Sequence, residues 1–178
     1  MFFKSKQKDI SVEEIEKQLF KIIVHNVDIS YLVGIMRGIN YKIELKDMAI
    51  LELLFSNFSA LLLALNMLSV NNDEYKKIFP GLLDSLHGKV YKYISVNYDI
   101  DKDNFNKIAQ QRQKEYLSLI GTNREGLGEK IYLNLSAEND AQIYSKKRDR
   151  ALCKMLGMKF FMITKMVADF FKKKNIIN

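Results

Sequence analysis

Residues 48–70 read MAILELLFSNFSALLLALNMLSV, and this stretch decides the fold that we expect. Seventeen of its 23 residues are apolar and Glu52 is its one ionisable group, so by length alone it could cross a bilayer. Its polar side chains, however, recur at helical spacing on one narrow stripe, formed by Glu52, Ser56, Ser59 and Asn66. Because a charge such as Glu52 is costly at bilayer depth, we expect the central helix of a helical bundle and not an integral membrane span.

The composition agrees with a helical protein. The chain has 178 residues, 48% of them hydrophobic, which suits one domain with a real core. One proline and eight glycines are few, and this favours helices over a turn-rich β architecture. A single cysteine excludes an internal disulfide framework, and the first residues, MFFKSKQKDISVEE, do not resemble a secretory signal. We expect a cytoplasmic protein whose residues 1–9 are frayed.

Apolar residues at helical spacing recur along most of the chain. The segment SVEE at 11–14 fits a capping box at the start of the first helix, and a short apolar helix is expected over 29–38. Further helices are expected from Pro80 to about 97, over about 103–120, over 127–135 and from about 137 to 173, with a loop over 121–130. The sequence predicts an all-α, single-domain bundle of about six or seven helices.

Three aspartates at alternate positions, Asp99, Asp101 and Asp103, suggest a calcium-binding loop. Such a loop requires a bidentate glutamate at its twelfth position and a glycine at its sixth, where this chain has Gln110 and Asn104. The ligand that closes the coordination shell is therefore missing. We expect Asp101 or Asp103 to cap the following helix instead.

Other signatures of catalytic or cofactor chemistry are incomplete. The segment GTNREGLGEK has the glycine spacing of a phosphate-binding loop but lacks the lysine and hydroxyl that should follow it. His25 and His87 have no metal-ligand spacing, and Cys153 has no cysteine neighbour. The sequence predicts no metal site, no cofactor and no catalytic residue.

Arg112 is the one charged residue in the middle of an otherwise apolar helix face, which is formed by Phe105, Ile108, Ala109, Tyr116, Leu119 and Ile120. A guanidinium at such a position extends toward water or finds a carboxylate, for which Glu52 is a candidate. The functional alternative is an anion-binding arginine in a cleft between helices. The sequence does not separate the two.

The surplus of positive charge is confined to the C-terminal part. From 141 to 178 the chain has ten Lys or Arg and two acidic residues; subtracting these from totals of 28 and 21 leaves 18 basic and 19 acidic residues elsewhere. The last fifth thus carries +8 and the remainder −1. A basic segment of this kind suits an acidic protein, a nucleic acid or an anionic membrane as partner.

The long C-terminal helix is expected to carry three stripes. A basic stripe contains Lys147, Arg150, Lys154, Lys165 and Lys172, with Phe161 among them. A methionine stripe beside it contains Met155, Met158, Met162 and Met166. The buried stripe should contain Leu152, Leu156, Phe160, Ile163, Val167 and Phe170. Methionine adapts to irregular partners and recurs on binding surfaces, although it also fills cores.

The length of this pattern poses a problem. As one helix, residues 137–173 would measure about 55 Å, whereas a compact domain of this size is about 40 Å across. Either the helix breaks, with Gly157 one candidate, or its end projects from the body.

These observations favour a non-enzymatic interaction module, which docks on a protein partner or on a second copy through the C-terminal helix. The predicted binding residues are Arg112, Lys147, Arg150, Lys154, Met158, Phe161, Met162 and Lys165. The main alternative is a nucleic-acid-binding protein that places the same Lys and Arg side chains on phosphates. An enzyme with a cleft near Arg112 and Glu52 is the third hypothesis.

Overall fold

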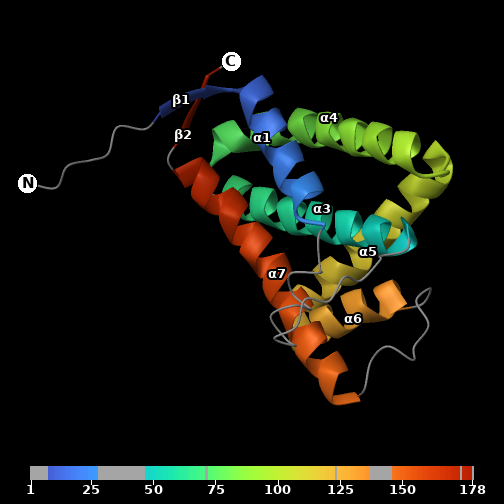
Figure 1. The fold of residues 1–178 in the computed structure, drawn as a ribbon. Coiled ribbons are helices and arrows are strands. Elements are labelled where there is room, and N and C mark those ends of the chain that lie inside the picture. The colour runs from blue at the N-terminus through green and yellow to red at the C-terminus, as the bar shows by residue number, and fades with distance from the viewer. Residues whose placement is uncertain are drawn as a thin grey trace, which may run out of the picture.

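A computed structural model describes residues 8–27, 47–70, 72–122, 124–136, 146–172 and 174–177. These residues form six helices and two short strands (Figure 1). The elements are β1 (Lys8–Ser11), α1 (Val12–His25), α3 (Asp47–Ser69), α4 (Asp73–Asn97), α5 (Lys102–Thr122), α6 (Arg124–Ser136), α7 (Lys146–Lys172) and β2 (Lys174–Ile177). The predicted all-α bundle is confirmed. The predicted helix over 29–38 lies outside the described residues.

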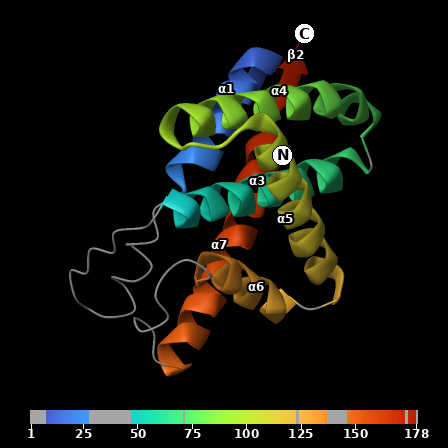
Figure 2. The same cartoon turned by 90° about the vertical axis from the view of Figure 1, so that its right-hand side faces the viewer.

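The helix α3 lies at the centre of the bundle, as residues 48–70 predicted. Leu54 and Leu61 belong to a core cluster shared with α1 and α4, whereas Leu53 and Ala60 belong to a second cluster shared with α6 and α7. Figure 2 shows α1 and α4 on one side of α3 and α6 on the other, with α7 crossing behind. Because both sides of α3 face protein, the helix is apolar nearly all round.

Among the described residues, one stretch is long and apolar enough to cross a membrane. It is Ile50–Ser69, with a mean hydropathy of 1.7, and 78% of its most apolar 18-residue window is buried inside the protein. A single buried helix of this kind is weak evidence for a membrane, because the core helix of a soluble protein has the same composition.

The predicted cap of α1 is present in part. The Ser11 hydroxyl accepts a hydrogen bond from the Glu14 backbone N–H at 3.2 Å. The Glu14 carboxylate accepts instead from the side-chain amide of Gln18, four residues further along the helix, at 2.5 Å. The buried face of α1 is formed by Ile15, Leu19 and Ile23, and it packs into the first core cluster.

Two predicted boundaries are wrong. Pro80 does not begin a helix, because α4 begins at Asp73, where the Asn72 side chain accepts from two backbone N–H groups, and Pro80 lies exposed inside it. The segment 121–130 is not a loop, because α5 continues to Thr122 and α6 begins at Arg124. The glycines suggested a loop there, but Gly128 instead allows the backbones of α6 and α7 to approach closely.

A two-stranded parallel ribbon joins the two ends of the described chain, and the sequence did not predict it. The strand β1 pairs with β2, with Ile10 opposite Ile176. Both isoleucines are buried in the first core cluster, which explains why so short a ribbon forms. Residues 8 and 9 therefore belong to a strand, although the stretch 1–9 was expected to fray; residues 1–7 lie outside the described part.

The helix α7 is continuous through Gly157, so the suggested break is absent. Its 27 residues correspond to about 40 Å. A Cβ built on Gly128 would lie 1.9 Å from the Cys153 carbonyl oxygen, so α6 and α7 are in backbone contact at this point. The buried face also differs at its end: Phe171 is 1% exposed, whereas Phe170 is only partly buried. Residues 137–145 are not described.

Candidate functional site

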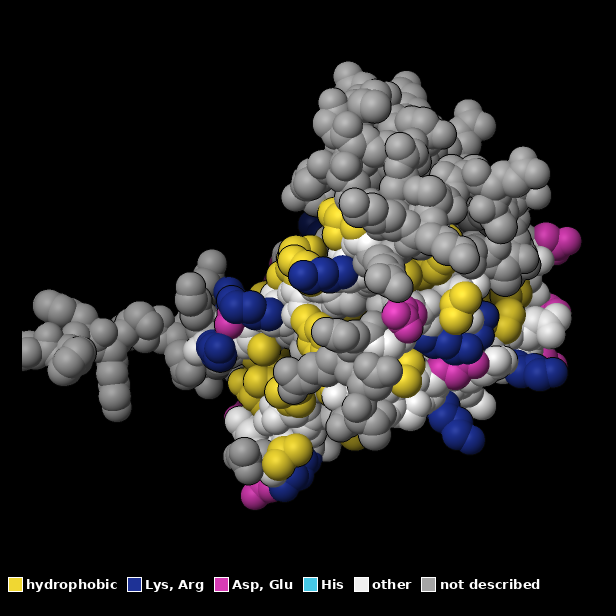
Figure 3. Space-filling model, turned by 90° about the horizontal axis from the view of Figure 1, so that it is seen from below, with side chains coloured by type: hydrophobic (Ala, Val, Ile, Leu, Met, Phe, Trp, Pro, Cys, Tyr) yellow, Lys and Arg dark blue, Asp and Glu magenta, His cyan; other side chains and the backbone are white. Residues whose placement is uncertain are grey.

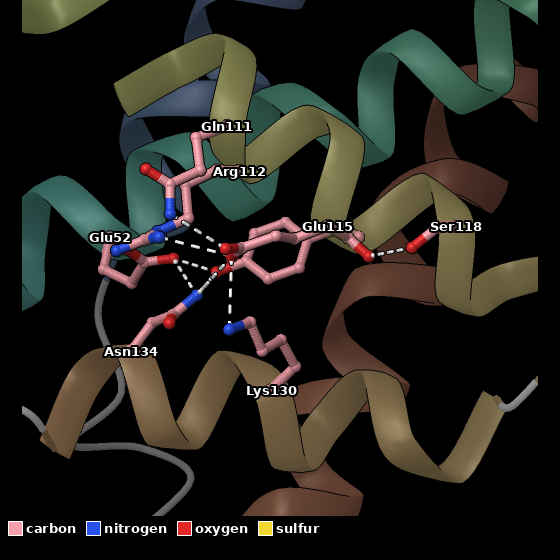
Figure 4. Close-up of polar contacts among 8 residues, drawn as sticks. Glu52, Gln111, Arg112, Glu115, Ser118, Lys130 and Asn134 are labelled. Carbon is pink, nitrogen blue, oxygen red and sulfur yellow. Dashed lines mark hydrogen bonds and ion pairs between the residues drawn. The ribbon is translucent and has the colours of Figure 1, made fainter. Parts of the chain in front are cut away.

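The first candidate site surrounds Glu52, which α3 places in the interior with only 4% of its surface exposed. Arg112 of α5 reaches it, with 2.6 Å between Nε and Glu52 Oε2 (Figure 4). The ion pair that the position of Arg112 suggested is therefore present. It links two helices that are distant in sequence.

Two further side chains complete the shell of Glu52. The Tyr116 hydroxyl donates to Glu52 Oε1. The Asn134 amide of α6 donates to the Tyr116 hydroxyl at 3.0 Å and lies 3.4 Å from Glu52 Oε1. The sequence predicted Tyr116 on the apolar face of its helix but not its polar role, and no sequence pattern pointed to Asn134. The spacing of Arg112 and Tyr116, one helical turn apart, was the available signal.

A second carboxylate, Glu115, forms the outer part of the same network. Arg112 Nη1 lies 3.2 Å and Lys130 Nζ 3.5 Å from Glu115 Oε2, and Gln111 donates to Glu115 Oε1 at 2.9 Å. Partial burial alone would raise the pKa of Glu115. The hydrogen bonds from Gln111 and Asn134 and the charges of Arg112 and Lys130 outweigh it and lower this pKa.

The inner carboxylate behaves differently. Burial raises the pKa of Glu52 above its ordinary value, and the hydrogen bond and charge of Arg112 offset this only in part. Burial prevails because Glu52 is far less exposed than Glu115, at 5% against 23% of the side chain. The network thus contains one carboxylate whose pKa is raised and one whose pKa is lowered.

The polar side chains around Glu52 form hydrogen bonds with one another. Both oxygens of Glu52 accept hydrogen bonds from side chains of α5 or α6, and Arg112 contacts both carboxylates. Satisfied buried polar groups of this kind fix the relative positions of the elements that carry them. The arrangement is a polar clamp between α3, α5 and α6, which we call the Glu52 network.

The aspartates before α5 cap that helix. Asp101 Oδ1 accepts from the backbone N–H groups of Asp103 and Asn104, each at 2.9 Å. The hydrogen bond from the Asn104 backbone is the main cause that lowers the pKa of Asp101. The predicted capping role is confirmed. Within the described part of the chain, no group of three or more His, Cys, Asp or Glu residues is placed to hold a metal ion.

A hollow of about 480 Å³ opens beside the start of α1 and was not predicted. It is lined by Ser11, Glu13, Glu14, Lys17, Phe20 and Lys89. Lys89 pairs with Glu16 at 2.6 Å, and the lining contains two acidic and two basic residues. The lining is therefore balanced in formal charge.

The second candidate site is the outward side of α7. Met158, Met162 and Met166 are 62%, 49% and 40% exposed, and Lys154 is exposed beside them. Phe161 is half-buried, with its ring 5.9 Å from that of Phe160 in the second core cluster. Figure 3, a view of the molecule from below, shows hydrophobic side chains next to basic and acidic ones on the described part of the surface that it draws.

The basic stripe of α7 is only partly available to a ligand. Lys165 and Lys172 both bind Asp169, at 2.5 Å and 2.9 Å. Hydrogen bonds from these two lysines lower the pKa of Asp169 to about 2. Lys154 makes no ion pair with any described residue. Lys147 and Arg150 lie in the first turns of α7, and their side chains are outside the description.

No family model, curated protein or solved structure matches the chain.

Proposed function

We propose that this protein is a non-enzymatic interaction module that binds another protein through the outward side of α7. We call this surface, formed by Lys154, Met158, Phe161, Met162, Lys165 and Met166, the methionine face. The observation that carries the proposal is the exposure of three methionines, 40–62%, on consecutive turns of a helix whose opposite side is core. An exposed apolar row of this kind stabilises nothing until a partner covers it.

These exposed fractions argue against the alternative that the methionines only fill the core. Other large apolar side chains are also exposed, such as Val96 on α4 and Met67 on α3, but single exposed apolar residues are normal on any protein. The methionine face differs because its members are contiguous along one helix. Methionine also loses little by adapting its side chain to a partner.

The nucleic-acid hypothesis is less well supported. Two of the five basic residues assigned to it, Lys165 and Lys172, already bind Asp169, which neutralises part of their charge. An enzyme centred on Arg112 and Glu52 is also disfavoured, because Arg112 and Tyr116 bind Glu52 and are therefore already engaged within the protein.

The test uses two labelled probes and three proteins. The probes are a synthetic amphipathic helical peptide with Asp and Glu beside its apolar face, and a duplex DNA. The proteins are wild type, a Met158→Gln/Met162→Gln variant and a Val96→Gln control. Self-association of each protein is measured in parallel by sedimentation.

We expect wild type and the Val96→Gln control to bind the peptide or to self-associate, and the double variant to do neither. The proposal is overturned if wild type shows neither interaction. It is equally overturned if the protein binds DNA in a salt-dependent manner, by roughly one power of salt concentration per phosphate contact, and the double variant binds it as well as wild type does.

A further inference from the structure

The charges of the Glu52 network balance only while Glu52 is ionised. Glu52 and Glu115 then carry the two negative charges, and Arg112 and Lys130 carry the two positive ones. If Glu52 becomes neutral, the two cations share Glu115 as their one carboxylate partner among the described residues. Because an uncompensated charge at a partly buried site is costly, this form of the network attracts one negative charge from solvent.

The hydrogen bonds around Glu52 allow its neutral form without a movement of the helices. The Tyr116 hydroxyl donates to Oε1 of the ionised carboxylate, and it can accept from a proton placed on that oxygen. The Asn134 amide contacts the same hydroxyl at 3.0 Å, and after a turn of the amide its oxygen can accept from the hydroxyl. Oε2 stays the acceptor for Arg112 Nε. Arg112 therefore keeps its position but loses the negative charge beside it.

The two cations of the network reach the surface, whereas Glu52 does not. The side chains of Arg112 and Lys130 are 19% and 35% exposed, and that of Glu52 is 5% exposed. Arg112 Nη1 and Lys130 Nζ lie 3.2 Å and 3.5 Å from the same atom, Glu115 Oε2, so the cations are neighbours (Figure 4). Arg112 uses Nε and Nη1 for the two carboxylates, and its Nη2 donates to no described residue. Donors thus remain on the outer side of the network.

We propose that the outer side of the Glu52 network binds one small monovalent anion, held by Arg112 and Lys130, when Glu52 is neutral. The site goes beyond the proposed function, because it includes no residue of the methionine face. Anion and proton binding are linked, since the two together add no net charge and each therefore favours the other. The raised pKa of Glu52 makes its neutral form easier to reach than that of an ordinary glutamate.

The other helices that pack on α3 do not supply a counter-charge to Glu52 within the described part of the chain. On α1 and α4, Glu16 and Lys89 pair with each other. On α7, Lys159 is buried but forms no ion pair with Glu52. The carboxylate is therefore titrated against the charges of α5 and α6 alone, which are Arg112, Glu115 and Lys130.

The experiment uses Glu52→Gln as a permanently neutral form. The glutamine oxygen can accept from Arg112 Nε, and its amide group can donate to the Tyr116 hydroxyl. The probe is chloride, which is exchanged for the bulkier gluconate at a constant ionic strength of about 0.15 M so that screening does not change. Glu52→Gln is combined with Lys130→Met and, as a matched control, with Lys107→Met, because Lys107 lies exposed on α5 without an ion pair to a described residue.

At neutral pH we expect chloride to raise the thermal midpoint of Glu52→Gln and of the Lys107→Met control. Adding Lys130→Met should reduce this gain by about threefold or more. Wild type should respond more strongly near pH 4.5 than at alkaline pH, and Glu115, whose pKa is lowered, still supplies its charge there. The proposal is overturned if Glu52→Gln unfolds at the same temperature in both salts, or if Lys130→Met leaves the gain unchanged.

An NMR titration of the Glu52 carboxyl carbon in wild type tests the linkage even if Glu52→Gln does not fold. Chloride should raise the measured pKa of Glu52 relative to gluconate, and Lys130→Met should abolish the difference. Equal pKa values in the two salts contradict the proposal, as does a difference that persists in Lys130→Met. The Met158→Gln/Met162→Gln variant should keep the chloride effect, so the failure of this site and the failure of the methionine face are distinguishable.

Discussion

Arg112 and Glu52 form an ion pair, 2.6 Å between Nε and Oε2, in which the arginine side chain is 19% exposed and the glutamate 5%. Removing one member of such a pair costs more than the pair itself contributes, because the other charge is left without a partner. This asymmetry gives a prediction that distinguishes the Glu52 network from a surface salt bridge.

Arg112→Met should destabilise the protein by about 3 kcal/mol, because Glu52 then has to be buried without its cation or be protonated. The double variant Arg112→Met/Glu52→Gln should recover part of this loss. Denaturant unfolding at neutral pH measures both. Equal destabilisation by the single and the double variant would show that Glu52 does not require its arginine.

The stability that depends on Glu52 should vary with pH. Its pKa in the folded protein is above the ordinary value of 4.5, so the folded state binds this proton more tightly than the unfolded state does. The contribution of Glu52 is therefore most favourable below 4.5 and is lost as the pH rises through the folded pKa.

Comparison of wild type with Glu52→Gln over a pH series isolates this contribution, because Glu115, Lys130 and the other charges of the network stay in place. We expect the stability of wild type relative to the variant to fall as the pH rises from about 4.5 toward neutrality. An opposite slope would mean that Arg112 outweighs burial.

The contact between α6 and α7 predicts opposite effects for two glycines. Gly128→Ala would place a Cβ 1.9 Å from the Cys153 carbonyl oxygen, which is backbone and cannot turn away. We expect a loss of about 3 kcal/mol or more as the helices separate. Gly157→Ala meets only Gly128 atoms at 3.5 Å, an ordinary contact, and should be neutral or stabilising by up to about 1 kcal/mol.

Gly88→Ala serves as the matched control, because nothing lies within 4 Å of its Cβ position on α4. Thermal unfolding should rank Gly88→Ala at or above wild type and Gly128→Ala far below it. If Gly128→Ala unfolds like wild type, the two helices are not in backbone contact.

His87 predicts a second pH effect of opposite sign. Its ring lies 4.9 Å from that of Phe105 and 5.9 Å from that of Phe58. Burial lowers its pKa below the ordinary 6.5, the charge of Lys102 lowers it further, and Asp84 acts against both. The unfolded state thus binds this proton more tightly, so stability is complete above 6.5 and is lost as the pH falls through the folded pKa.

His87→Gln should remove this part of the pH dependence and leave the rest unchanged. Titration of the His87 ring by NMR gives an independent measurement. A ring that titrates at or above 6.5 would contradict the assignment.

The sequence predicts the local features of this fold well, but it predicts contacts between residues far apart in the chain poorly. The apolar run of α3 and the single charge within the face of α5 led to the central helix and to the Arg112–Glu52 pair, because both depend on helical periodicity. Pro80 misled because α4 begins earlier, at Asp73 behind the Asn72 cap, and contains Pro80 at an exposed position in its interior.

Gly126 and Gly128 misled for another reason. Glycine occurs both in loops and where two helices cross closely, so its presence in the sequence does not distinguish them. The contact of Gly128 with α7 shows that the second explanation applies here. The β1–β2 ribbon was missed because each strand has four residues and its partner lies at the opposite end of the chain. Asn134 was missed because its partners are on other helices.

The methionine face gives the last prediction, which separates surface from core. Met158→Gln/Met162→Gln changes two side chains that are 62% and 49% exposed, so the free energy of unfolding should stay within about 0.5 kcal/mol of wild type. Phe161→Ser with Met158→Gln should cost more, about 1–2 kcal/mol, because the partly buried Phe161 ring packs against the second core cluster, 5.9 Å from the ring of Phe160. Both variants should nevertheless lose binding, since each removes apolar area that only a partner covers. Chemical denaturation and sedimentation on the same samples measure the two effects, with Val96→Gln as control. A loss of more than about 3 kcal/mol in Met158→Gln/Met162→Gln would show that these methionines belong to the core, and the methionine face would then not be a binding surface.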